Sequence, residues 1–539
     1  MKSFFNVTQS ENRNKLGFSG SLSLPALRRA WSLAGLPVLL FASLLLRLYR
    51  LGVHDFWFDE VYSAAYAFSP WSHWNAPLYW DLLHFWIKIA GISEISLRLP
   101  SVLFGLLSTA AVFFLGEKLF NRKTAFLAAV LITLSPFQIW YAQEARDYGM
   151  VVFLGILSSY VLFTEAPRNR FRGWLAFSLV SLAGIYTNYF YIFLLAAQFL
   201  YVLCVFRSCA YKAFLSFSFV AGLFALYASR FLSRFLFVSK GFWVPIPGWR
   251  SLKILFQNYW VGYNGTAFLY GLSWFMTLFF LGALFFVIFR VREKRPGIIF
   301  CLFLLMLPLG AVFLFSKFFF PIFLPRGLLL FSPYFFLLIA CAATALPRKI
   351  AITAVCISIA TLCWGTKLYF EDRLYPLEEY HLGVYQKKPV RTIVRFLESQ
   401  VGEGEIIVLT NVSLMPGIDF YAKRKVPLLH LFFPQIRGSI WERPVQETSV
   451  NIPVQKITEF EFKRMWVLSS DWGRTGKLDE NSSKVKTWLD SHLKLISSRE
   501  LDGLWIYCYE RSSGESERRV IPGHSLKSVA AHEGKAFRE

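Results

Sequence analysis

The run IIFCLFLLMLPLGAVFLFS, residues 298–316, decides the class of fold because it contains no charged residue. A segment of this length and apolarity can cross the hydrocarbon core of a bilayer as a helix. Similar apolar runs lie near 31–50, 98–116, 124–141, 149–164, 174–189, 191–206, 212–229, 267–289, 327–346 and 350–368. We therefore expect an α-helical polytopic membrane protein with about eleven transmembrane helices.

The composition supports this class and excludes several others. Of 539 residues, 55% are hydrophobic and only 17% are charged, whereas a soluble domain carries about 25% charged residues. These figures exclude a disordered chain, a collagen and a coiled coil. The seven cysteines form no CxxC pair, so we expect neither a structural zinc site nor a disulfide framework.

The charged residues predict the orientation of the helices. Residues 1–30 and the alternate short loops near 117–123, 165–173, 207–212, 290–297 and 346–349 hold 19 Lys or Arg against 4 Asp or Glu. The positive-inside rule makes these segments cytoplasmic. Much of the net charge of +23 is then explained by topology, and no nucleic-acid partner is required.

The first apolar run, residues 31–50, lacks a cleavage site for a signal peptidase. We therefore expect an uncleaved anchor after a basic cytoplasmic N-terminus.

One outward-facing loop breaks the charge rule. Residues 230–266 carry a basic cluster without any acid: Arg230, Arg234, Lys240, Arg250 and Lys253. Two interpretations stay open, namely contact with lipid headgroups and a site for an anionic lipid.

The sequence changes character after the last apolar run. Helix-like segments at 391–401, 416–423 and 484–495 alternate with strand-like segments at 406–410, 426–431, 465–470 and 504–510. We therefore expect a membrane domain over 31–368 and a small extracytoplasmic α/β domain over 369–511. No glycine-rich phosphate loop follows its strands. Residues 512–539, rich in Ser, Gly, Glu and Arg, are expected to be disordered.

Two outer segments carry residues suited to catalysis. The segment FWFDE, residues 56–60, places Asp59 and Glu60 directly beyond the first helix. An aromatic belt on a solvated loop would also look like this. The alternative is a carboxylate where a lipid headgroup and a polar acceptor meet, one acid acting as general base and the other as its hydrogen-bonding or metal partner. Glu144 and Arg146 lie in the second segment, SPFQIWYAQEARDYG at 135–149.

These motifs, taken in order, resemble a known family. The segments are FWFDE, NAPLYWDLLHFWIKIAG, SEISLRLPSVLFGLLS, LSPFQIWYAQEARDYGM, GIYTNYFYIF and FLPRGLLLFSP. They are similar to the GT-C membrane glycosyltransferases, in particular to the group related to protein O-mannosyltransferases and the lipid A aminoarabinose transferase (glycosyltransferase family 39-like). The resemblance covers most of 31–346.

The resemblance implies roles for individual residues. Asp59 corresponds to the family's catalytic base, with Glu60 and Glu144 as further catalytic candidates. Arg146 and Arg326 would bind the phosphate of the donor through forked guanidinium groups, and Lys317 would act as a point charge. Arg98 is expected to pair with Glu94 or with a lipid headgroup.

The sequence departs from the family at two places that bear on a metal cofactor. Relatives commonly have His-Pro-Pro where this chain has Asn75, Ala76 and Pro77, and many have a histidine where it has Asn188. Asn is a poor zinc ligand. Since no cofactor is certain, a divalent metal ion stays open; its candidate ligands are Asp59, Glu144, His54 and His73.

The resemblance thus implies a multi-pass enzyme of the bacterial inner membrane. It would move a hexosyl or pentosyl group from a polyprenyl-phosphate donor to an envelope acceptor at the outer face, with inversion. Its partners would be the donor, membrane lipids and an acceptor that is a lipid, a glycan or a protein. The alternatives are a lipid or polysaccharide transporter without transferase activity, and a ligase or polymerase acting on lipid-linked glycans.

Overall fold

The computed structural model describes residues 24–68, 76–240, 244–262, 266–373, 387–411, 414–423, 428–432, 450–470, 477–501 and 503–511. The predicted tail 512–539, most of residues 1–30 and the metal candidate His73 lie outside the described residues.

A helical body accounts for the first two thirds of the chain. Its α-helices are α1 (Leu24–Leu48), α2 (Phe58–Phe68), α3 (Leu78–Ala90), α4 (Glu94–Leu119), α5 (Arg122–Leu134), α6 (Pro136–Ala142), α7 (Tyr148–Glu165), α8 (Phe171–Thr187), α9 (Tyr191–Val205), α10 (Ala210–Ala225), α11 (Ala228–Ser239), α12 (Trp249–Val261), α13 (Ala267–Arg290), α14 (Arg295–Phe318), α15 (Ser332–Ala343) and α16 (Arg348–Phe370). The short 3-10 turns η1 (Arg207–Cys209), η2 (Arg292–Lys294) and η3 (Gly327–Phe331) join some of them.

Local sequence explains where these helices begin and break. The side chains of Ser93 and Asn121 accept hydrogen bonds from backbone N–H groups in the first turns of α4 and α5, which satisfies donors that a helix start leaves open. Pro136 begins α6, and α5 and α6 are bent by 65° relative to each other. The bend lets residues 143–147 turn into the interior of the body, where all but Arg146 are buried.

The expected helical membrane fold is confirmed, but the number of spans is not. Each predicted run overlaps a helix or two adjoining helices. Among the described residues, six helices are long and apolar enough to cross a membrane, or up to seven if α5 and α6 form one bent span. Gly35–Leu48, Tyr191–Val205 and Gly327–Ala343 are apolar but shorter. The count of eleven therefore stays a prediction.

The C-terminal α/β domain is built on one sheet. Its elements are α17 (Val390–Gln400), β1 (Ile406–Leu409), α18 (Met415–Tyr421), β2 (Leu428–Phe432), β3 (Val450–Pro453), η7 (Val454–Glu459), β4 (Arg464–Ser470), α19 (Glu480–His492), β5 (Leu493–Leu501) and β6 (Leu504–Arg511). The strand order is β3-β2-β1-β4-β6-β5; β1 to β4 are parallel, and β6 runs antiparallel to β4 and β5.

Alternate residues of the strands form two separate cores. Ile407 and Leu409 of β1 pack with α17 and α18, whereas Ile406 and Val408 pack with α19 and η7, as the two-residue period of a strand requires. The predicted helix 484–495 ends earlier, at His492, because Leu493 begins β5. Strands β3 and β5 were not predicted.

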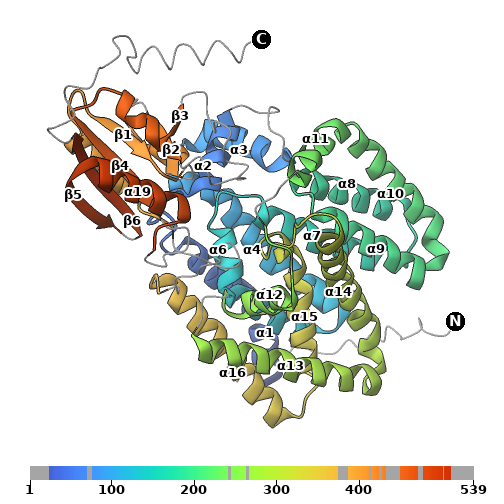
Figure 1. Cartoon of the computed structure of the whole chain (residues 1–539). Coiled ribbons are helices and arrows are strands. Elements are labelled where there is room, and N and C mark those ends of the chain that lie inside the picture. Colours follow the sequence, from blue (N-terminus) through green and yellow to red (C-terminus); the bar gives the residue numbers. More distant parts are fainter. Residues whose placement is uncertain are drawn as a thin grey trace.

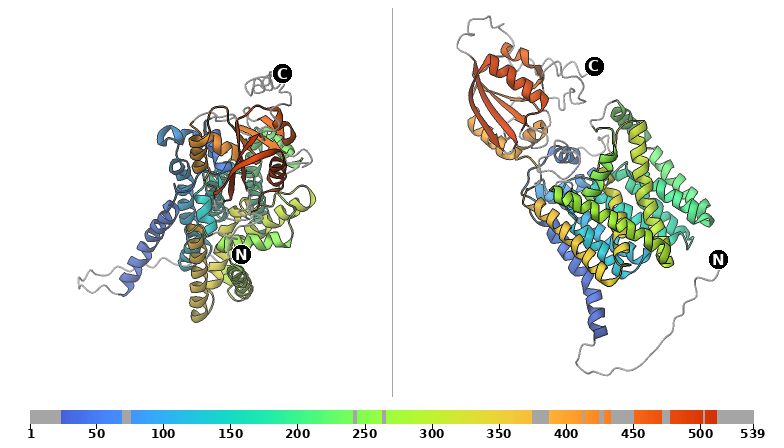
Figure 2. Two further views of the ribbon diagram at one scale, coloured as in Figure 1. Left: turned by 60° about the vertical axis from the view of Figure 1, so that its left-hand side comes forward. Right: turned by 60° about the horizontal axis from the view of Figure 1, so that its bottom comes forward.

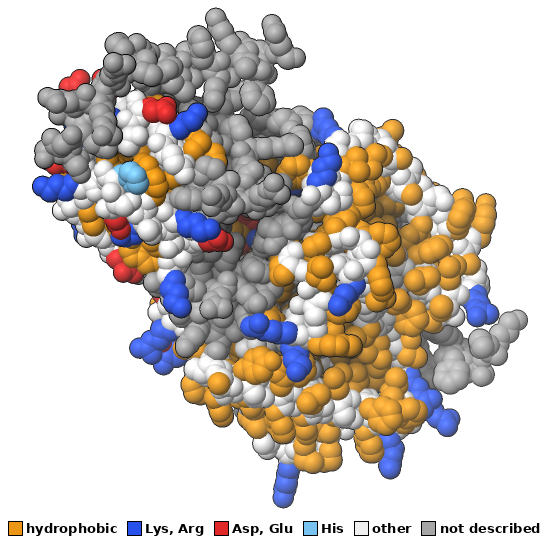
Figure 3. Space-filling view, in the orientation of Figure 1, with side chains coloured by type: hydrophobic (Ala, Val, Ile, Leu, Met, Phe, Trp, Pro, Cys, Tyr) orange, Lys and Arg blue, Asp and Glu red, His pale blue; other side chains and the backbone are white. Residues whose placement is uncertain are grey.

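The α/β domain sits at one end of the helical body. Figure 1 shows it, in orange to red, beside α2 and α3. In the right-hand view of Figure 2 the beginning of α1 projects from the opposite end. Hydrophobic side chains cover much of the visible helical body in Figure 3, whereas the α/β domain carries charges of both signs. An apolar outer surface is what a lipid-facing helical body requires.

Candidate active site

The first turn of α2 directs two neighbouring carboxylates to different surroundings. Asp59 and Glu60 follow Phe58, at which α2 begins, and consecutive helical residues point about 100° apart. The Asp59 side chain is 17% exposed, whereas that of Glu60 is 0% exposed. Only Asp59 is therefore placed to meet a substrate directly.

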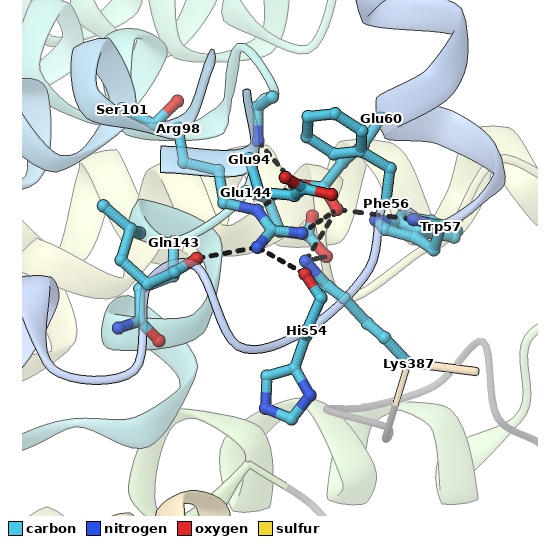
Figure 4. Close-up of polar contacts among 12 residues, drawn as sticks. His54, Phe56, Trp57, Glu60, Glu94, Arg98, Ser101, Gln143, Glu144 and Lys387 are labelled. Carbon is cyan, nitrogen blue, oxygen red and sulfur yellow. Dashed lines mark hydrogen bonds and ion pairs between the residues drawn. The ribbon is translucent and has the colours of Figure 1, made fainter. Parts of the chain in front are cut away.

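Glu60 is held by a fork of hydrogen bonds from α4. Arg98 donates from Nε to Glu60 Oε1 at 2.7 Å and from Nη2 to Oε2 at 2.8 Å. The same guanidinium donates to the backbone oxygens of Leu51, His54 and Asp55. The predicted pairing of Arg98 with Glu94 or a headgroup is wrong, because Arg98 is buried deep enough to meet Glu60 instead (Figure 4).

The α/β domain supplies a second cation to Glu60. Lys387 Nζ donates to Glu60 Oε2 at 2.8 Å and lies 3.9 Å from Glu144 Oε1. Burial alone would raise the pKa of Glu60, but the positive charges of Arg98 and Lys387 bring it down to about 2. Burial, followed by the neighbouring Arg98, lowers the pKa of Lys387. We regard the pair as ionised because of its short, charge-assisted hydrogen bond.

Glu144 is the least satisfied acid of the described site. It is fully buried, and neither carboxyl oxygen accepts a hydrogen bond from the described residues. Burial raises its pKa to about 8, with Lys387 acting against the rise and Glu60 adding to it. Glu144 is therefore mostly protonated at neutral pH, so it can donate a hydrogen bond but is a poor base in this state.

Asp59 lies between two arginines. Arg326 Nη1 is 3.2 Å from Asp59 Oδ2, and Arg146 Nη1 donates to the backbone oxygen of Asp59 at 3.4 Å. The Arg146 guanidinium lies over the rings of Trp80 and Tyr148, 5.6 and 5.7 Å from their centroids. Stacking of this kind fixes the plane of a guanidinium while leaving its N–H edge directed outward.

The remaining predicted site residues make no described contact with Asp59, Arg146 or Arg326. Lys317 is exposed at the end of α14 and forms no ion pair with the described residues. His54 Nε2 faces Asp372 at 3.3 Å, and burial lowers the pKa of His54 to about 4. Over the described ranges, no three His, Cys, Asp or Glu side chains are grouped to hold a metal ion. The residues present there do not fit a metal centre, and we derive no step through one.

The sequence does not predict the roles of two buried cations of this site, Arg98 and Lys387, for different reasons. Arg98 was noticed, but its partner was misassigned because the depth of a side chain cannot be read from its distance along the chain. Lys387 was missed altogether. Its local sequence, QKKPV at 386–390, resembles an exposed linker, and only the docking of the α/β domain buries it.

Comparison with known proteins supports one fold. Residues 75–230 match the family model described as dolichyl-phosphate-mannose-protein mannosyltransferase. The apo structure of ArnT from Cupriavidus metallidurans superposes with a TM-score of 0.59 at 12% identity, covering 89% of this chain and 98% of that one. The chain has the GT-C membrane fold and resembles the O-mannosyltransferases and ArnT.

Two further solved structures are similar to the chain. ArnT bound to undecaprenyl phosphate matches with a TM-score of 0.57, 12% identity and coverage of 89% of this chain and 98% of that one. The Archaeoglobus fulgidus oligosaccharyltransferase reaches 0.49 at 12% identity over 91% of this chain and 75% of that one. No curated protein sequence matches the chain significantly. At these identities the structural likeness concerns the GT-C fold, and the activity is argued from the site.

Proposed function

We propose that the chain is an integral membrane glycosyltransferase. It moves a sugar from a polyprenyl-phosphate donor to an acceptor at the face of the membrane that carries the α/β domain. The proposal places that face outside the inner (plasma) membrane and the N-terminus in the cytoplasm. The resemblance to the mannosyltransferase model and to ArnT, a relative solved with undecaprenyl phosphate, supports this class of donor.

The observation that carries the proposal is the partly exposed Asp59 beside two arginines. Asp59 contacts Arg326 through its carboxylate, and Arg146 through its backbone oxygen. Transfer from a lipid phosphate needs a base for the acceptor and cations for the leaving phosphate within a few ångströms of each other. Asp59 supplies the base and the two arginines supply the cations, at the end of α2 nearest the α/β domain.

The proposed reaction is a single displacement. The Asp59 carboxylate takes the proton of the acceptor hydroxyl or amine as that atom attacks the anomeric carbon of the sugar. The bond from the anomeric carbon to the phosphate oxygen breaks, its electron pair stays on the lipid phosphate, and the anomeric configuration inverts. Arg326 and Arg146 meet the charge that develops on the phosphate. Lys317 is exposed and has no described contact with the group, so we assign it to the membrane interface.

The first test replaces Asp59 by Asn in the full-length protein. Asp59→Asn keeps the size of the side chain and removes the base, so turnover of a polyprenyl-phosphate sugar should fall by about 100-fold or more. Undecaprenyl phosphate should still bind. Asp490→Asn, on the surface of α19, is the control and should keep full activity. A folded Asp59→Asn protein with normal turnover would remove Asp59 from the role of base.

The broader proposal has its own test. Envelope glycolipids and glycans of cells with and without the protein should differ by one sugar substituent. Unchanged glycans together with altered export of a lipid or polysaccharide would instead support a transporter.

A further inference from the structure

Lys387 reaches the site from a position close in sequence to the core of the α/β domain. Lys387 precedes α17 by three residues, and Val390, the first residue of α17, belongs to the core between α17 and the sheet. Lys387 is only 8% exposed, and its ammonium donates to Glu60 at 2.8 Å. Only three residues separate the lysine from that core. Movement of the α/β domain away from the helical body would therefore break the ion pair between Lys387 and Glu60.

Further contacts join the same domain to Asp55 and Phe56, which precede Asp59, and to Glu94 of α4. The backbone N–H of Arg391 donates to Asp55 Oδ2 at 2.8 Å, and its side chain forms an ion pair with Glu94. The Tyr421 hydroxyl accepts a hydrogen bond from the N–H of Phe56 at 2.8 Å. The α/β domain thus holds residues on both sides of Asp59 without touching its carboxylate in any described contact.

Substitution of Lys387 would disturb the balance of charges among the buried groups around it. Glu60 and Glu144 share two buried cations, Arg98 and Lys387. Glu144 is mostly protonated even beside Lys387, so the loss of Lys387 falls on Glu60. Glu60 would keep Arg98 but lose one of the two short donors to its Oε2. A fully buried carboxylate that loses one of its two cations is disfavoured, so the segment that carries Glu60 loosens.

We propose that Lys387 is a positioning residue through which the docked α/β domain holds Phe56–Glu60, and with it Asp59, in the arrangement that transfer requires. This inference deepens the proposed function and rests on it. The base is then in place only while the domain is docked.

The experiment compares Lys387→Met with Lys484→Met in the full-length protein. Lys484 is an exposed lysine of α19 paired with Glu480, so its loss should change nothing. In Lys387→Met, amide hydrogen exchange of residues 54–60 should rise by about 10-fold or more, and kcat for a polyprenyl-phosphate sugar should fall by about 10-fold or more. The Kd of undecaprenyl phosphate should change by less than about twofold, since Arg326 and Arg146 are intact.

A conservative variant separates positioning from simple destabilisation. Lys387→Arg keeps a cation at the end of the side chain that meets Glu60. This protein should retain more kcat and slower exchange at residues 54–60 than Lys387→Met. If Lys387→Met does not fold, Tyr421→Phe carries the test, because it removes only a hydroxyl and should raise exchange in the same residues 54–60.

The outcomes distinguish the two proposals. Wild-type exchange at 54–60 and wild-type kcat in folded Lys387→Met would overturn the positioning role, even where Asp59→Asn is inactive and the proposed function stands. A fall in thermal stability alone, with kcat and exchange unchanged, would overturn it equally. Absence of sugar transfer by the wild-type protein would contradict the proposed function instead, while the exchange measurement would still report on Lys387.

Discussion

Asp59 and Glu60 are neighbours in the chain but differ in what they can do. Glu60 has both oxygens engaged by Arg98 and Lys387, whereas Asp59 retains part of its exposure beside Arg326. A carboxylate whose lone pairs are occupied by buried cations is a weak base. The geometry therefore favours Asp59 as the base and leaves Glu60 to fix the loop that presents it.

Arg326 offers a test of phosphate binding at the residue scale. A guanidinium can bind two phosphate oxygens at once, and a lysine cannot. Arg326→Lys should therefore raise the Kd for undecaprenyl phosphate by about 10-fold, which corresponds to one charge-assisted hydrogen bond. Lys317→Arg should leave the Kd unchanged, because Lys317 is exposed and has no described contact with the group. Equal affinity in Arg326→Ala and the wild type would reduce Arg326 to an interfacial cation.

Glu144 predicts a pH dependence of stability. Its pKa in the folded protein is about 8, above that of an ordinary Glu, so folding favours the protonated form. This contribution is complete below about pH 4.3, the ordinary pKa of Glu, and is lost as the pH rises through 8. Glu60 acts in the opposite sense, and its contribution is lost only as the pH falls toward 2.

The melting temperature in detergent measures this difference. The wild type should lose stability relative to Glu144→Gln as the pH rises from 6 to 9, where Glu60 contributes a constant amount. A difference between the two proteins that does not vary with pH would show that Glu144 is not buried in its protonated form.

At the scale of elements, the site depends on close packing of α4 against α6. A Cβ at Gly105 would lie 2.7 Å from the Ala142 Cβ and 2.8 Å from Arg47 Nε. Since α6 leads directly to Gln143 and Glu144, any displacement of α6 moves residues 143–147.

Gly105→Ala should therefore lower stability by about 1–3 kcal/mol, the usual cost of overpacking a core. Gly310→Ala is the matched control in α14, because nothing lies within 4 Å of a Cβ there. Melting temperatures of the two variants in the same detergent provide the comparison. A Gly105→Ala protein as stable as Gly310→Ala would show that α4 and α6 can separate without cost.

At the scale of the whole molecule, the α/β domain and the helical body form one site. Lys387, Arg391 and Tyr421 come from the former, and Glu60, Asp55 and Glu94 from the latter. These contacts argue against an α/β domain that moves freely relative to the helical body. All the described residues of the site precede Arg511 in the sequence.

Removal of residues 512–539 should consequently leave transfer activity within about twofold of the full chain. Sugar transfer by protein truncated after Arg511, normalised to folded enzyme, checks this. A large loss would show that the terminal residues contribute to the acceptor site.

The sequence by itself determined the membrane class, the approximate place of each apolar helix and most strands of the α/β domain. These depend on local hydrophobic length and period, which neighbouring residues carry. The motifs also predict Asp59, Glu60, Glu144, Arg146 and Arg326 as site residues. Only the tertiary structure decided that Arg98 and Lys387 neutralise Glu60 and that Lys317 is exposed. It also decided that Glu144 is buried without accepting a hydrogen bond from the described residues. The physical reason is that burial and ion pairing between residues as distant as 60 and 387 arise from the packing of whole domains, and no local pattern in the sequence encodes that packing.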